Sequence, residues 1–372
     1  MTERVRARDL GIEIGYLRPG TWNAITDVPG VRVGFSTIIE GEGDLVVGQG
    51  PVRTGVTAVF PRDGVYENPV FAGYHQLNGN GEMTGIAWIQ ESGLLTSPIG
   101  ITNTHSVGVV RDAFIEWDRE QYAGPGIMPW RLPVVSETSD HYLNDANGFH
   151  VKPKHVFAAL ESAASGPVAE GNVGGGTGMI CHEFKGGTGT SSRVLEPEDG
   201  GWTVGVLVQA NYGWRKHLSI DGVPVGREIS TDVVGSPRSK PAQYQQPGDG
   251  SIVVIVATDA PLLPIQCKRL AQRATLGVAR VGGNGDNGSG DLFLAFSTGN
   301  EGLEPDDDKT PVAVRMTPNN VISKLFEAVA DATEEAILNA LCMAETMTGS
   351  TGRTVHAMPL DRVAEIMRAY RR

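Results

Sequence analysis

One serine stands where its own backbone could make it reactive. The segment PGDGSIVVIVATDAPL, residues 247–262, passes from a loop of Pro, Gly and Asp into Ser251 and then into five apolar β-formers. A serine hydroxyl becomes a nucleophile when a base removes its proton, and the α-amine of the same residue is such a base if that residue is a chain N-terminus. An α-amine titrates near about 7.7 to 8.0, so part of it is free base at neutral pH. Ser251 is therefore a candidate nucleophile that needs no histidine.

Creating that terminus requires cleavage of the Gly250–Ser251 bond. The Ser251 hydroxyl can attack the Gly250 carbonyl in an N-to-O acyl shift, after which water hydrolyses the ester. Glycine at position 250 allows the strained backbone geometry that the attack needs. The polar segment 235–250, GSPRSKPAQYQQPGDG, is expected to be a surface linker whose end can be left free after the cut. The alternative is a serine that only begins a strand after a glycine turn, which is a common arrangement.

Two glycine clusters resemble phosphate-binding loops. The segment 283–288, GNGDNG, satisfies G-x-G-x-x-G, but the residues after it predict a strand, whereas a dinucleotide site needs a helix there. The segment 171–178, GNVGGGTG, lacks the Lys-Ser/Thr pair of a P-loop. We therefore expect tight turns at both places. No G-x-S-x-G or H-E-x-x-H motif occurs, and no pattern marks one of the eight histidines as part of a Ser-His-Asp triad, although such a triad stays open.

The cysteines do not predict a metal site or a disulfide framework. Cys181, Cys267 and Cys342 are three widely spaced residues, so we expect reduced thiols packed as small apolar side chains. The triplet Cys181-His182-Glu183 is a weak candidate for metal ligation, because adjacent residues of one strand point to opposite faces. We expect neither a metal nor a cofactor.

The composition is that of an ordinary folded protein. Of 372 residues, 40% are hydrophobic and 20% are charged, with a formal net charge of -12. The acidic balance argues against a nucleic-acid partner. The longest apolar runs are about six residues, whereas a membrane-spanning helix needs roughly twenty. The first residues, MTERVRARDLG, contain no apolar stretch typical of a secretory signal, so we expect a cytoplasmic protein, or a periplasmic one if a signal was removed.

Helices and strands are mixed without a regular βαβ period, which favours a layered α/β or α+β architecture. Periodicity predicts strands at 31–38, 55–60, 85–89, 202–210, 252–258 and 292–297. It predicts helices at 106–121, 154–165, 261–279 and 320–346.

The chain resembles a known family over nearly its whole length. It is similar to the self-processing serine N-terminal-nucleophile peptidases of the L-aminopeptidase/D-Ala-esterase/amidase and β-peptidyl aminopeptidase family. The likeness lies in NAITDVPGVRVG (23–34), VSETSD and YLND (within 135–145), GNVGGGTGM (171–179), LVQANYG (207–213), GSIVVIVATDAPLLP (250–264), GSGDLFLAFSTGN (288–300) and AILNALCMAETMTG (336–349).

This resemblance implies a fold and an assembly. The fold is a four-layer αββα sandwich in a single domain, 1–372, similar to the N-terminal nucleophile hydrolases but with different strand connectivity. Self-cleavage would give an α subunit of residues 1–250 and a β subunit of residues 251–372. Members of the family form homo-oligomers, commonly of four αβ units.

The resemblance also assigns catalytic roles. Ser251 attacks the substrate carbonyl, and its amine holds the proton. Ser289 and Asp291 stand two residues apart on a strand, so their side chains share a face. In the family, the residue at 289 hydrogen-bonds the amine and hydroxyl of the nucleophile and an acid at 291, which is Glu in some members, orients it. Asn211 offers an amide donor to the developing oxyanion.

Glu137 is the candidate for substrate recognition, since a buried carboxylate binds a free ammonium group by a charge-assisted hydrogen bond. The alternative for Glu137 is an ordinary solvated carboxylate. Some family members carry an aromatic residue two positions later, where this sequence has Ser139, and Tyr142 follows as a further candidate for substrate binding. The implied substrates are short peptides, amides or esters with a free amino group, and the acyl residue could be an α-L-amino acid, D-alanine or a β-amino acid.

Two other functions stay open. The same nucleophile could serve a narrow amidase or an acyl transferase on a small metabolite, although related folds with such activities use Thr rather than Ser251. A non-enzymatic protein could use the glycine loops to bind a nucleotide.

Overall fold

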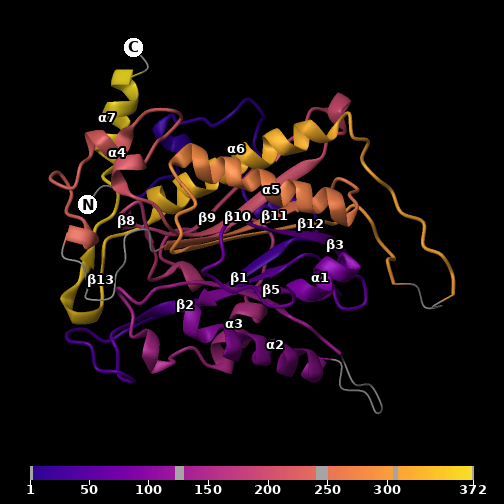
Figure 1. The fold of residues 1–372 in the computed structure, drawn as a ribbon, viewed down its shortest axis with the longest axis horizontal. Coiled ribbons are helices and arrows are strands. Elements are labelled where there is room, and N and C mark those ends of the chain that lie inside the picture. Colours follow the sequence, from indigo (N-terminus) through magenta and orange to yellow (C-terminus); the bar gives the residue numbers. More distant parts are fainter. Residues whose placement is uncertain (1–2, 122–129, 240–249, 305–308, 371–372) are drawn as a thin grey trace.

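Two β-sheets lie face to face between two layers of helices (Figure 1). The computed structural model describes residues 3–121, 130–239, 250–304 and 309–370. The larger sheet contains, in spatial order, β4 (Leu94–Leu95), β3 (Val70–Gln76), β12 (Ser289–Ser297), β11 (Gly250–Thr258), β10 (Thr203–Asn211) and β9 (Gly187–Val194). The smaller sheet contains β1 (Arg32–Glu40), β2 (Val52–Phe60), β5 (Ile99–Asn103) and β6 (Val134–Thr138).

The helices cover the outer faces of the two sheets. Helices α5 (Pro264–Val281) and α6 (Ile322–Met343) pack on the larger sheet, and α2 (Val107–Gln121) and α3 (Pro153–Glu161) pack on the smaller one (Figure 1). The predicted four-layer αββα sandwich is therefore confirmed. The remaining elements are α1 (Ile86–Ser92), α4 (Val225–Glu228), α7 (Leu360–Tyr370) and the short strands β7 (Ile180–Cys181), β8 (Phe184–Lys185), β13 (Met347–Thr348) and β14 (Thr354–Val355).

The strand that begins at the candidate nucleophile is buried on both faces, as its Val/Ile composition predicts. In β11, Val253 and Ile255 belong to the core between the two sheets, whereas Ile252 and Val254 belong to the core under the helices. β11 pairs antiparallel with β10 and parallel with β12. Since both neighbours hydrogen-bond along its length, the register of β11 is fixed from two sides.

The strand predicted at 85–89 is wrong, because these residues begin α1. Gly85 and Gly93 bound this short helix with φ of 74° and 75°, a left-handed conformation that glycine adopts without strain. A five-residue apolar run does not distinguish a strand from a short helix by periodicity. The other predicted helices and strands are confirmed within a few residues, and most of the predicted linker 235–250 lies outside the described residues.

Strand β9 was not predicted, because its sequence GTGTSSRV reads as a glycine-rich turn. A Cβ on Gly189 would lie 2.0 Å from the carbonyl oxygen of Ala336 on α6. Glycine at this position therefore allows the long helix to lie directly on the edge of the sheet.

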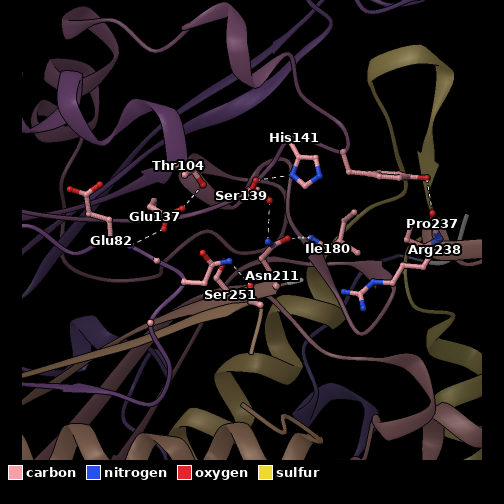
Figure 2. A pocket seen from close by; sticks show the side chains of 16 residues that line it. Glu82, Thr104, Glu137, Ser139, His141, Ile180, Asn211, Pro237, Arg238 and Ser251 are labelled. Carbon is pink, nitrogen blue, oxygen red and sulfur yellow. Dashed lines mark hydrogen bonds between the residues drawn. The ribbon is translucent and has the colours of Figure 1, made fainter. Parts of the chain in front are cut away.

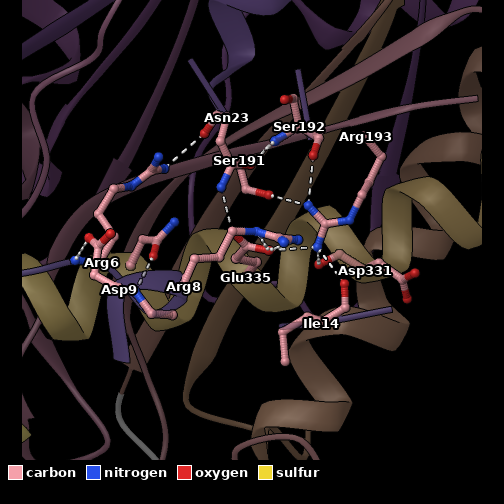
Figure 3. Close-up of polar contacts among 12 residues, drawn as sticks. Arg6, Arg8, Asp9, Ile14, Asn23, Ser191, Ser192, Arg193, Asp331 and Glu335 are labelled. Carbon is pink, nitrogen blue, oxygen red and sulfur yellow. Dashed lines mark hydrogen bonds and ion pairs between the residues drawn. The ribbon is translucent and has the colours of Figure 1, made fainter. Parts of the chain in front are cut away.

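A buried ion cluster joins the N-terminal segment, β9 and α6 (Figure 3). Arg193 and Glu335 have fully buried side chains whose charged atoms are 2.7 Å apart. Arg8 donates three further hydrogen bonds to Glu335, at 2.9, 3.1 and 3.0 Å. Burial alone would raise the pKa of Glu335, but the guanidinium groups of Arg193 and Arg8 lower it below its ordinary value. Glu335 is therefore a charged residue that balances one fully buried cation, Arg193, and one half-buried cation, Arg8.

We expect the substitution Glu335→Gln to destabilise the fold strongly, because it leaves two guanidinium groups without their counter-charge. Breaking a buried ion pair costs about 3–5 kcal/mol. The matched control on the same helix is Glu327→Gln, since Glu327 forms only an exposed pair with Lys324 at 3.9 Å, worth about 0–1 kcal/mol. Denaturant unfolding at one protein concentration measures both effects. Equal losses in the two variants would contradict the stabilising role of the cluster.

Candidate active site

Strand register brings Ser251 and Asn211 to one side of the larger sheet. Ser251 on β11 is paired with Asn211 on β10 and with Gly290 on β12. Registered side chains of neighbouring strands lie on the same face. Ser251 therefore points to the same side as Val253, toward the smaller sheet, and its residue is 4% exposed.

A cavity of about 540 Å³ opens at this place. Three of the residues predicted from sequence, Ser251, Asn211 and Glu137, line it together, and Tyr142 lines it as well (Figure 2). Gly250 is also part of the wall, so the bond before Ser251 lies beside the cavity. The further lining residues come from the loop after β3, from the ends of β5 and β6, from β7, from the segment before residue 240 and from the residue before β12. They are Gly79, Asn80, Gly81, Glu82, Thr104, Ser139, His141, Ile180, Pro237, Arg238 and Gly288.

Glu137 lies one residue before the end of β6, and its carboxylate is buried and not solvated. Its residue is 3% exposed. One oxygen accepts a hydrogen bond from the backbone N–H of Glu82 at 3.0 Å, and the other accepts one from the Thr104 hydroxyl. Burial raises the pKa of Glu137, although these two hydrogen bonds oppose the rise. A carboxylate that is hydrogen-bonded and faces a cavity is suited to binding an ammonium group.

The amide of Asn211 is held in one orientation. Its oxygen accepts a hydrogen bond from the backbone N–H of Ile180 at 2.8 Å, and its nitrogen donates to the carbonyl of Ser139 at 3.0 Å. The amide nitrogen carries two hydrogens. Within the described part of the chain the second hydrogen has no acceptor, and it is therefore available to a ligand in the cavity.

Ser289 and Asp291 are brought together, but they do not line the cavity. They are registered with Gly250 and Ile252, so their side chains lie on the opposite face of the sheet from that of Ser251. The Ser289 hydroxyl donates to Asp291 at 2.5 Å, and the Asn78 amide donates to the same carboxylate at 2.8 Å. Burial raises the pKa of Asp291, and the bond from Ser289 opposes this. The register thus places Ser289 beside Gly250, the residue directly before Ser251.

Gly250 has a steric role in addition to the one predicted from its sequence context. A Cβ at this position would lie 3.0 Å from the Cα of Tyr212 and 3.1 Å from the carbonyl oxygen of Asn211. The chain just before Ser251 therefore passes very close to the end of β10, and a larger residue at 250 would push the two segments apart.

Tyr142 is a wall residue with two anchors. Its hydroxyl donates to the carbonyl of Pro237 at 3.1 Å, and the guanidinium of Arg353 lies 5.0 Å from the centre of its ring. Ser139, which stands where some family members have an aromatic residue, places its hydroxyl 2.8 Å from Nδ1 of His141. This part of the wall is therefore polar.

The sequence did not identify the loop after β3, which connects two parts of the site. The Asn80 backbone N–H donates to the carbonyl of Ser289 at 3.1 Å, and the neighbouring Glu82 N–H binds Glu137. A Cβ on Gly290 would lie 2.6 Å from the carbonyl oxygen of Asn80, so glycine at 290 lets the loop cross the strand. The alternation of Asn and Gly in LNGNGEMTG (77–85) is the signal that could have drawn attention to this loop.

The sequence suggested that the triplet at 181–183 lies on one strand, and this is wrong. His182 and Glu183 form the turn between β7 and β8, with φ of 48° and 64°. The His182 ring packs edge-on against Tyr212, and burial lowers its pKa to about 4. Among the described residues no group of three or more His, Cys, Asp and Glu could hold a metal ion. The three cysteines are buried free thiols, as predicted.

The chain is similar over most of its length to known proteins. The pattern of Peptidase family S58 matches residues 23–355. The chain is 51% identical to the beta-peptidyl aminopeptidase BapA of Sphingosinicella microcystinivorans, over 100% of this chain and 93% of that protein.

Two solved structures are similar over almost their whole length. One is a beta-aminopeptidase from a Burkholderia species, with 53% identity, a TM-score of 0.88 and coverage of 98% of this chain and 99% of that one. The other is the L-aminopeptidase D-Ala-esterase/amidase of Ochrobactrum anthropi, with 45% identity, a TM-score of 0.89 and coverage of 99% of both chains. The second is described as a prototype of the serine aminopeptidases and a new variant of the Ntn hydrolase fold.

These matches confirm the resemblance inferred from the sequence motifs, and they confirm the fold that it implies. The family pattern and the relatives cover the strands that carry Ser251, Asn211 and Glu137 as well as the loops between them. The protein is therefore a hydrolase that belongs to peptidase family S58.

Proposed function

We propose that the protein is a self-processing serine aminopeptidase whose nucleophile is Ser251. The observation that carries the proposal is the position of Ser251 at the start of a doubly buried strand and on the wall of a cavity, directly after the Gly250 peptide. Attack of the Ser251 hydroxyl on the Gly250 carbonyl transfers the acyl group from nitrogen to oxygen, and water then hydrolyses the ester. The products are residues 1–250 and 251–372, with a free amine on Ser251.

The described residues fit the steps of aminopeptidase catalysis. The carboxylate of Glu137 binds the ammonium group of the substrate, and the Ser251 hydroxyl attacks the scissile carbonyl. The free N–H of Asn211 donates to the oxyanion. The amine of Ser251 takes the proton of the hydroxyl and passes it to the leaving amine, and water then releases the acyl group from Ser251.

Ser289 and Asp291 act as positioning residues in this mechanism. Since Ser289 is registered with Gly250, cleavage creates the new amine on the Ser289 side of the strand. The Ser289 hydroxyl, oriented by Asp291, can then accept a hydrogen bond from the amine and hold it near the nucleophile. The contact of Ser289 with the hydroxyl of Ser251, implied by the family, would need a shift of the freed chain end.

The substrates that fit are short peptides, amides or esters with a free amino group. Glu137 supplies the recognition of the amine, and a cavity of about 540 Å³ has room for small acyl and leaving groups. The names of the relatives give β-peptidyl substrates in one case and L-amino acid or D-alanyl substrates in the other. These three acyl classes are the ones to assay.

Assembly and location are further parts of the proposal. The family resemblance supports a homo-oligomer of four αβ units, and the exposed side chains of Leu45, Val46 and Val47 between β1 and β2 are apolar surface that such contacts could cover. Among the described residues no helix has the length and apolarity to cross a bilayer. We propose a cytoplasmic location for the enzyme.

We expect the purified protein to consist of two fragments, produced by cleavage of the bond between residues 250 and 251. The Ser251→Ala variant should remain one chain, because the acyl shift requires the hydroxyl. Intact mass under denaturing conditions measures this. Ser251→Cys is the matched control, since a thiol can still attack and should yield slow cleavage. An uncut parent chain, or a cut Ser251→Ala chain, would contradict the proposal.

We expect Glu137→Gln to weaken binding of a free amino acid product, because the neutral amide does not pair with an ammonium group. Loss of one partner of a buried charge pair costs about 2–5 kcal/mol. In the parent enzyme the affinity should fall as the pH drops through the raised pKa of Glu137, since the protonated carboxyl is neutral. In the variant this pH dependence should disappear.

Competitive inhibition by the product follows this change when it is measured from about pH 4, near the ordinary pKa of a Glu carboxyl, up to about pH 8. The matched control is Glu82→Gln, whose side chain is exposed at the same cavity. If both variants keep the pH dependence of the parent enzyme, Glu137 does not bind the ammonium group.

We expect Asn211→Ala to lower kcat by about 100- to 1000-fold with a much smaller change in KM, because an oxyanion donor acts mainly in the transition state. Asn211→Asp keeps an acceptor for the Ile180 N–H but has no donor, and it should be at least as slow. Steady-state kinetics on an amide substrate measure both. If only the alanine variant is slow, Asn211 supports the Ile180 segment and not the oxyanion.

A further inference from the structure

The cavity carries opposite charges on its two sides. Glu137 and Glu82 lie on one side of Ser251, and the guanidinium of Arg238 points into the cavity from the other side (Figure 2). Arg238 also lines an adjoining cavity of about 580 Å³, together with Arg215, Lys216 and Arg227. Glu183 lines the adjoining cavity as well, so the positive charge that the active-site cavity itself carries on the side away from Glu137 is that of Arg238.

Arg238 is held in place by neighbours that the structure describes. Its guanidinium stacks on the ring of Trp214, 4.2 Å from the ring centre. Its backbone N–H donates to the hydroxyl of Ser236 at 2.9 Å, and that hydroxyl donates to Glu183 in the turn between β7 and β8. The preceding carbonyl of Pro237 accepts the hydroxyl of Tyr142. The stacking contact thus positions the guanidinium, and the two hydrogen bonds hold the backbone of the segment that carries it beside the cavity.

The order of charges matches one class of substrate. In a dipeptide the ammonium group lies on one side of the scissile carbonyl, and the carboxylate of the leaving amino acid lies on the other. With the ammonium at Glu137 and the carbonyl at Ser251, the leaving group extends toward Arg238. A guanidinium binds a carboxylate through two parallel N–H donors, which makes it a selective partner for a free chain end.

We propose that Arg238 is a specificity-determining residue that binds the C-terminal carboxylate of the leaving amino acid, so that the preferred substrates are dipeptides. This inference rests on the proposed function of Ser251 and Glu137. It gives Arg238 a role in binding the leaving group, separate from recognition of the amine.

The test compares matched substrates that differ only in the carboxylate: β-alanyl-L-leucine against its C-terminal amide, and L-alanyl-L-leucine against its amide. For the parent enzyme we expect kcat/KM to be higher for the acids. Arg238→Gln should lower kcat/KM for the acids by about 10- to 100-fold, which is the loss expected when a charge-assisted hydrogen bond to the substrate is removed. The same variant should change kcat/KM for the amides by less than about threefold, within ordinary context variation.

Two further variants sharpen the result. Arg238→Lys keeps the charge but not the planar pair of donors, and it should recover part of the preference for acids. Arg227→Gln removes an exposed positive charge that does not line the active-site cavity, and it should leave the preference unchanged. Intact masses show whether each variant has been processed like the parent.

The role of Arg238 is overturned if Arg238→Gln lowers kcat/KM equally for the acids and the amides. It is also overturned if Arg227→Gln lowers kcat/KM for the acids as much as Arg238→Gln does. In both cases turnover of the amides by the parent enzyme would still support the aminopeptidase function. A parent enzyme that cleaves none of the four substrates would count against the proposed function itself, and with it against this inference.

Discussion

The register of β11 between its two neighbours is the constraint on which the site depends. Ser251 faces the cavity because it is paired with Asn211 on one side and Gly290 on the other. A slip by one residue would turn Val253 toward the helices and Ile252 toward the smaller sheet, exchanging the two cores that they fill. The apolar run after Ser251 therefore does more than fill space, since its packing on both faces decides which way the serine points.

Two buried carboxylates show how the fold separates stability from recognition. Glu335 is surrounded by Arg193 and Arg8, which lower its pKa, so its charge is already balanced within the protein. Glu137 is held by Thr104 and a backbone N–H, and burial raises its pKa. Hydrogen bonds fix the position of Glu137 without supplying a full positive charge. The first carboxylate joins three parts of the chain, and the second lies on the cavity wall without a full counter-charge, as its proposed role in binding an ammonium group requires.

The sequence predicts the layers, and the place of Ser251 at the cavity, better than it predicts the walls of the site. The Gly-Ser junction before an apolar run marks Ser251 by local chemistry, and resemblance to a family adds Glu137. Thr104, by contrast, contacts Glu137 only because β5 and β6 pair in parallel, which no local pattern reveals. Strand β9 was missed because Gly189 is required by contact with a helix that is distant in the sequence, and no local pattern reveals such a contact. The misassigned segment 85–89 is simply too short for its periodicity to decide between helix and strand.

The central claim, that Ser251 forms an acyl-enzyme, is tested most directly by trapping that intermediate. The enzyme would be mixed with an amino acid ester, quenched in acid within the first turnovers, and separated into its chains for mass analysis and peptide mapping. The account predicts that the chain beginning at Ser251 gains the mass of one acyl group, carried as an ester on the Ser251 hydroxyl. Turnover of the ester without any adduct on that chain, or with the adduct on another residue, would contradict it.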